Sequence, residues 1–108
     1  MSKTRELAIP IPHEEVAAFC QKWGVRRLAF FGSIVRGDFD PERSDVDVLV
    51  EFDRQSLKQP RGLEIIDAQN ELAAILGRDV DLGEFHLLNR WIRRDVLSEA
   101  VEEYVAPE

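Results

Sequence analysis

Apolar residues recur at intervals of three and four along three stretches of the chain, which is the pattern of an amphipathic helix. The predicted helices run from about His13 to Trp23, from about Leu63 to Leu76 and from about Asn89 to Tyr104. Glycine directly follows the first two, at Gly24 and Gly77, and favours the left-handed conformation in which many helices end. The third carries an apolar stripe made of Leu97, Val101, Tyr104 and Val105.

Strands are predicted where the apolar pattern is continuous or alternates. These stretches are Leu28–Phe31, Asp45–Phe52 and Arg78–Leu82. Ile34–Arg36 is compatible with one helical turn, and residues 38–43, which include Pro41, with a loop. The order of helix, strand, turn, strand, helix, strand and helix predicts an α/β (α+β) fold, with a small mixed three-stranded sheet flanked by helices.

Two aspartates open the second predicted strand. Alternate side chains of a strand share a face, so Asp45 and Asp47 point the same way. Neighbouring carboxylates repel one another, but they suit a hard cation such as Mg²⁺, which takes oxygen ligands and accompanies phosphates. The Gly32-Ser33 turn upstream exposes backbone that can hold those phosphates. Together these features favour nucleotidyl transfer, and the alternative is a pair of solvated, inert carboxylates after a plain tight turn.

Length and charge narrow the choice of function. The 108 residues suit one domain, residues 1–108, with a core of its own. The formal charge of −7 argues against wrapping nucleic acid, which requires clustered Lys and Arg, but bound cations would allow a nucleotide. A lone cysteine, Cys20, excludes an internal disulfide, and no apolar stretch is long enough to span a bilayer. A cytoplasmic protein that contacts no membrane is therefore expected.

A resemblance to a known family rests on three segments. These are Gly32-Ser33, Arg36-Gly37-Asp38 and Ser44-Asp45-Val46-Asp47, and they resemble the Gly-Ser and Asp-x-Asp signature of DNA polymerase β-like nucleotidyltransferases. The short chain and the Arg-Gly-Asp are similar to the minimal nucleotidyltransferase (MNT) branch, whose members are small antitoxins usually paired with a HEPN ribonuclease toxin. Ser33 and Asp45 stand one residue further apart than the commonest spacing in that family, and the loop with Pro41 can absorb the difference.

In that family a third carboxylate on a neighbouring strand completes the site, usually between Val and Leu. Val80-Asp81-Leu82 matches this pattern. A crossover through the predicted helix at residues 63–76 can bring its strand beside the strand of Asp45 and Asp47. Asp79 shares the polar face of the strand and is the alternative, but its flanking residues fit less well.

The resemblance implies Mg²⁺-dependent transfer of AMP, or another nucleotide, from ATP to a hydroxyl. The catalytic and metal-binding residues would be Asp45, Asp47 and Asp81, which would hold two Mg²⁺ ions, and the nucleotide-binding residues would be Gly32, Ser33 and Arg36. An ion pair of Arg36 with Asp38 or Asp40 is an equal alternative to its phosphate contact.

The resemblance also implies the acceptor, a tyrosine of a HEPN toxin encoded alongside. An added adenylate would place negative charge and bulk where RNA must enter the nuclease. Two alternatives remain open. One is an antitoxin that blocks its toxin by binding, with a non-essential site, and the other is a nucleotidyltransferase that acts on a small molecule such as an aminoglycoside.

Overall fold

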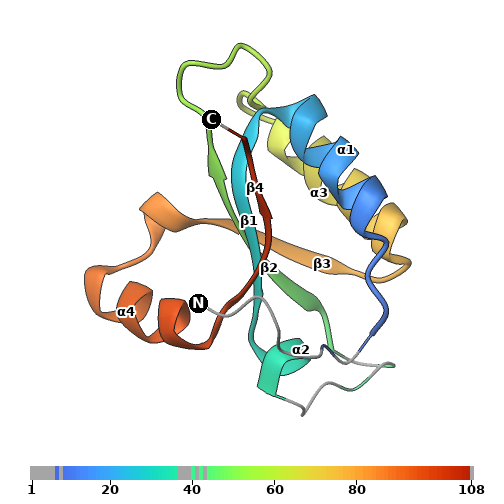
Figure 1. Cartoon of the computed structure of the whole chain (residues 1–108), viewed down its shortest axis with the longest axis vertical. Helices are drawn as coiled ribbons and strands as arrows, with labels where there is room; N and C mark the ends of the chain where they lie inside the picture. The colour runs from blue at the N-terminus through green and yellow to red at the C-terminus, as the bar shows by residue number, and fades with distance from the viewer. Residues whose placement is uncertain (1–6, 8, 37–39, 41, 43, 108) are drawn as a thin grey trace.

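A mixed four-stranded sheet forms the centre of the computed structural model, which describes residues 7, 9–36, 40, 42 and 44–107 (Figure 1). The strands are β1 (Val25–Phe31), β2 (Val46–Phe52), β3 (Val80–Glu84) and β4 (Val101–Val105). The helices are α1 (His13–Trp23), α2 (Ser33–Arg36), α3 (Glu64–Leu76) and α4 (Arg90–Glu99), and a 3₁₀ turn, η1, covers Phe85–Leu87. The strand order is β3-β2-β1-β4, with β2 and β3 parallel and the other pairs antiparallel. The α/β class and the crossover that brings β3 beside β2 are confirmed.

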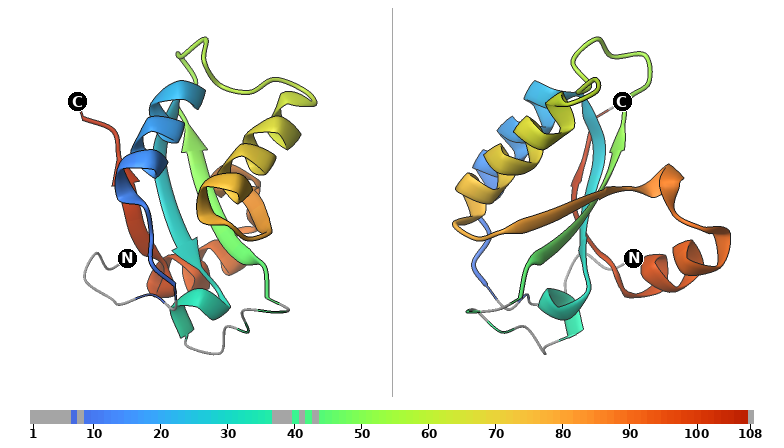
Figure 2. Two further views of the ribbon diagram at one scale, coloured as in Figure 1. Left: turned by 90° about the vertical axis from the view of Figure 1, so that its right-hand side faces the viewer. Right: turned by 180° about the vertical axis from the view of Figure 1, so that it is seen from behind.

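Helices cover the two faces of the sheet unequally. Figures 1 and 2 show α1 and α3 side by side on one face and α4 on the opposite side. Val46, Val48 and Val50 of β2 are fully buried in the core beneath α1 and α3. Leu49 points the other way, into a smaller cluster with Phe85 of η1. No helix within the described residues is long and apolar enough to cross a membrane.

The prediction of one last helix through Tyr104 is wrong, because α4 ends at Glu99 and the chain continues as β4. β4 pairs with β1, and the prediction of three strands therefore missed one strand. The cause is a register shift in that pairing, between Leu28 and Ala29 of β1. Because of this shift, Val101 and Tyr104 both contact the same core although they are three residues apart. A spacing of three between apolar residues is typical of a helix, so the sequence pattern of this strand predicts a helix.

A polar contact joins α1 to α3. The ammonium of Lys22 and the indole Nε1 of Trp23 both donate to the carboxylate of Glu71, the latter at 2.6 Å. The hydrogen bond from Lys22 is the largest effect and holds the pKa of the Glu71 carboxyl below its ordinary 4.5; burial opposes it in part, and the bond from Trp23 lowers the pKa by a smaller amount. The carboxylate therefore ties the two helices together while it is ionised.

We expect Glu71→Gln to lower the free energy of unfolding by less than about 1 kcal/mol near pH 7, because the pair is partly exposed. The folded-state pKa is depressed, so this contribution is present above the unfolded-state pKa and is lost as the pH falls through the folded-state pKa. Urea denaturation at about pH 7 and about pH 3 should show the gap between parent and variant narrowing at the lower pH. Glu15→Gln, at an exposed position of α1, is the matched control, and an equal gap at both pH values would contradict the assignment.

Candidate active site

The end of β1, the short helix α2 and the start of β2 meet at one end of the sheet, at the bottom of Figure 1. Gly32 turns the chain there with a φ of 76°, and the Val35 amide donates to its carbonyl at 3.0 Å. Ile34 and Val35 are buried, which anchors α2 against the sheet. Ser33, the first residue of α2, is partly buried beside the turn.

The carboxylate of Asp47 lies directly against this turn. Phe31, the last residue of β1, is opposite Asp47 in the antiparallel pairing. A methyl group on Gly32 would overlap Asp47 Oδ2 and lie 3.1 Å from its Cγ. A side chain at position 32 would therefore force the Asp47 carboxylate to move, so the position of the carboxylate depends on the glycine at this turn.

Asp81 lies beside Asp47 on the neighbouring strand. The parallel register of β2 and β3 places the two residues opposite one another, and adjacent strands are about 5 Å apart. Val80 and Leu82 pack against the core under α1 and α3, so Asp81 points to the other face of the sheet. Asp79, the alternative, is exposed and precedes β3, and its carbonyl accepts a hydrogen bond from the Val46 amide at 2.9 Å.

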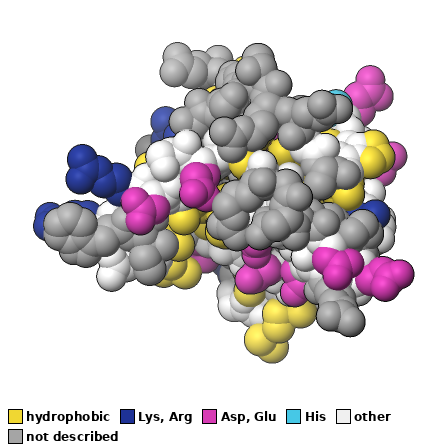
Figure 3. Space-filling view, turned by 90° about the horizontal axis from the view of Figure 1, so that it is seen from below, with side chains coloured by type: hydrophobic (Ala, Val, Ile, Leu, Met, Phe, Trp, Pro, Cys, Tyr) yellow, Lys and Arg dark blue, Asp and Glu magenta, His cyan; other side chains and the backbone are white. Residues whose placement is uncertain are grey.

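Asp45 precedes β2 and is exposed. Of the residues that the structure describes, no three histidine, cysteine or acidic side chains are gathered closely enough to hold a metal ion. The fold thus brings Asp47 and Asp81 together and leaves Asp45 at the entry to the strand. Figure 3 shows this end of the molecule. Several acidic side chains lie on the part of its surface that the structure describes, and their negative charge favours the approach of cations.

Two predicted positions fall partly or wholly outside the described residues. Arg36 ends α2, but its side chain is not described, and neither is Asp38. The phosphate contact of Arg36 and the competing ion pair with Asp38 or Asp40 therefore stay predictions. Asp40 is exposed, and its Oδ1 accepts a hydrogen bond from the Glu42 amide at 2.9 Å.

Gln69 of α3 is a residue near the site that the sequence did not single out. Its Oε1 accepts a hydrogen bond from the backbone amide of Leu82, the residue after Asp81, at 3.1 Å. A polar residue on an amphipathic helix is normally assigned to solvent, so the sequence pattern carried no signal for this contact.

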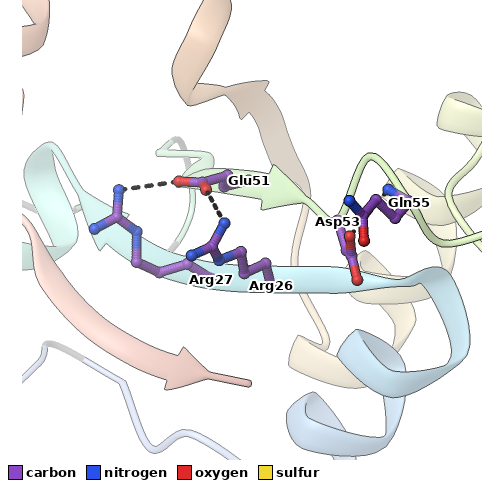
Figure 4. Close-up of polar contacts among 5 residues, drawn as sticks. All are labelled: Arg26, Arg27, Glu51, Asp53 and Gln55. Carbon is purple, nitrogen blue, oxygen red and sulfur yellow. Dashed lines mark hydrogen bonds and ion pairs between the residues drawn. The ribbon is translucent and has the colours of Figure 1, made fainter. Parts of the chain in front are cut away.

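A cavity of about 950 Å³ lies at the other end of the sheet, where β1 begins and β2 ends. Arg27 Nη2 donates to Glu51 Oε2 at 3.2 Å, and Arg26 approaches the same carboxylate at 3.7 Å (Figure 4). The other charged residues that line the cavity are Asp53, Arg54, Glu84 and His86. Glu51 is four residues beyond Asp47, about 13 Å along the strand, and none of the residues predicted to bind nucleotide or metal lines this cavity.

A sequence model described as the nucleotidyltransferase domain matches residues 15–106. The chain belongs to the nucleotidyltransferase domain family. The resemblance, the enzyme class and the fold class expected from the sequence are confirmed.

Relatives of this nucleotidyltransferase domain include the protein adenylyltransferase MntA of Thermococcus cleftensis, 41% identical over 75% of this chain and 77% of the relative. A solved structure described, provisionally, as a minimal nucleotidyltransferase is 33% identical with a TM-score of 0.67, and the match covers 82% of this chain and 86% of that one. The fold also matches a complex of an MNT antitoxin with a tri-AMPylated HEPN toxin of Shewanella oneidensis, with a TM-score of 0.61 and 16% identity over 87% and 70% of the two chains.

Proposed function

We propose that this chain transfers AMP from ATP to a tyrosine hydroxyl of a HEPN-family toxin and thereby acts as an antitoxin. The observation that carries the proposal is the parallel register of Asp47 and Asp81, next to the turn at Gly32. The Thermococcus cleftensis relative supports adenylyl transfer to a protein, and the Shewanella oneidensis complex supports a HEPN partner.

The residues at the site fit Mg²⁺, because all the side chains that would hold it are carboxylates, the oxygen ligands that this hard cation prefers. Asp47 and Asp81 lie opposite one another in the register of the two strands, and the exposed Asp45 stands two residues before Asp47 in the chain, which supports a shared cation between them. When bound between these residues, Mg²⁺ would offset the charge of the triphosphate and lower the pKa of the attacking hydroxyl.

The chain's own residues position the reactants. The backbone at Gly32 permits close approach of the triphosphate, and the Ser33 hydroxyl donates to a phosphate oxygen. The acceptor oxygen forms a bond to the α-phosphorus, and the bond between that phosphorus and the pyrophosphate oxygen breaks. Asp81 takes the proton that the hydroxyl loses. The products are the adenylylated toxin and pyrophosphate.

The direct test is to incubate the chain with labelled ATP, Mg²⁺ and the product of the adjacent open reading frame. Mass spectrometry of the partner should show an adenylate-sized increment on a tyrosine, and the increment should be absent when EDTA replaces Mg²⁺. A panel of small acceptors, including an aminoglycoside, is incubated in parallel. Label that appears only on a small molecule would overturn the proposal.

A further inference from the structure

β3 lies at the edge of the sheet, so only one side of its backbone faces a partner strand, β2. Outward-pointing amides of an edge strand must find a side-chain acceptor or water. Leu82 has such an acceptor, because its amide donates to Gln69 Oε1 at 3.1 Å in a partly buried position. A side chain of α3 thus takes the place of a further strand at this point of β3.

The amide of Leu82 belongs to the peptide unit that follows Asp81. The six atoms from one Cα to the next lie in one plane, so a hydrogen bond to the Leu82 N–H orients the whole unit, including the Cα of Asp81. Pairing with β2 holds β3 from the inner side, and Gln69 holds the same segment from the outer side. The Cα of Asp81, which lies opposite Asp47 in the strand register, is therefore held from both sides.

Asp81 depends on its backbone for this placement. Its side chain is exposed, and within the described part of the chain no donor or cation contacts its carboxylate. Gln69, by contrast, projects from a well-anchored helix, since Ala68 and Leu72 of α3 are fully buried. The helix can therefore serve as a fixed support for the strand.

We infer that Gln69 is a positioning residue, which holds Asp81 at the spacing from Asp47 that a shared divalent cation requires. The inference rests on the metal-binding role of Asp81 in the proposed function. The new element is Gln69, which we infer keeps the edge strand β3 in its position beside β2 at this site.

Three variants test the inference. Gln69→Met keeps the length of the side chain but lacks the acceptor oxygen, whereas Gln69→Glu keeps an acceptor. Asn70→Met makes the same kind of change at the exposed neighbouring position of α3 and is the matched control. Each protein is titrated with Mn²⁺ alone, its Leu82 amide exchange is followed by NMR, and its melting temperature is recorded.

We expect Gln69→Met to weaken Mn²⁺ binding about tenfold, as loss of an outer-sphere support does at other metal sites, and to speed exchange of the Leu82 amide. Gln69→Glu should retain slow exchange and bind Mn²⁺ at least as tightly as the parent, and Asn70→Met should match the parent in both measurements. A merely structural role would lower the melting temperature of Gln69→Met and leave the Mn²⁺ affinity of the folded protein unchanged, which would overturn the inference alone. A parent chain that binds no Mn²⁺ would overturn the proposed metal site as well.

Discussion

Asp47→Asn is expected to lower the rate of AMP transfer by about 10²–10³-fold, the loss typical of removing one group that stabilises charge in a transition state. Asparagine keeps the shape of the side chain at its place opposite Asp81 but removes the charge that the cation requires. Asp47 lies against the turn proposed to hold the triphosphate, so its charge would act beside the bound nucleotide. The measurement is the initial rate of label transfer from ATP to the toxin, at saturating Mg²⁺.

The control for this variant is Asp67→Asn, at an exposed position in the first turn of α3, which should transfer AMP at the parental rate. Co-purification with the toxin shows whether the complex survives. A variant that binds the toxin but no longer neutralises it supports catalysis. Full neutralisation by Asp47→Asn would instead favour an antitoxin that acts by occupancy, and a near-parental transfer rate would remove Asp47 from the active site.

Gly32→Ala should both destabilise the fold and abolish most of the activity. The residue has a φ of 76°, which costs an alanine about 1–2 kcal/mol, and the new methyl group would overlap the Asp47 carboxylate. Displacing that carboxylate should lower AMP transfer by about 10²-fold or more, as expected when a charge-stabilising group is lost. Urea denaturation gives the change in stability, and the transfer assay on protein that is still folded gives the change in rate.

Gly77→Ala separates the two effects. Gly77 has a similar φ of 68°, but no atom lies within 4 Å of the position that its methyl group would take. It should show the backbone cost of about 1 kcal/mol with unchanged transfer activity. Equal activity losses in the two variants would mean that backbone strain alone, and not the position of Asp47, explains the effect at Gly32.

The helix–strand alternation of the chain was predictable because its local patterns agree with the final structure. The prediction for α1 matches its residues, and α3 differs by one residue at its start. β4 was not predictable from local pattern, since the stripe of Val101, Tyr104 and Val105 fits a helix and is made strand-like by its pairing with β1. That pairing joins segments far apart in the chain, which no short window of sequence contains.

The candidate site was predictable to the extent that it follows from strand alternation and register. The apolar residues that flank Asp47 and Asp81 predicted that each lies on the polar face of its strand, whereas the register that places them opposite one another was not predicted. The close approach of Gly32 to Asp47 and the bond from Leu82 to Gln69 depend on tertiary distances, so the sequence alone could not reveal them. Only the fold brings these pairs together.

The place of β4 in the sheet has a consequence for synthesis on the ribosome. β1 lies between β2 and β4, and Val101 fills part of the core beneath α1. A nascent chain can pair β1 with β2 early in synthesis. The other edge of β1 can pair with β4 only after residues 101–105 have left the ribosome. The sheet is therefore complete only after translation has passed residues 101–105, so a chain truncated before β4 should lack one edge pairing of β1 and the part of the core that Val101 fills.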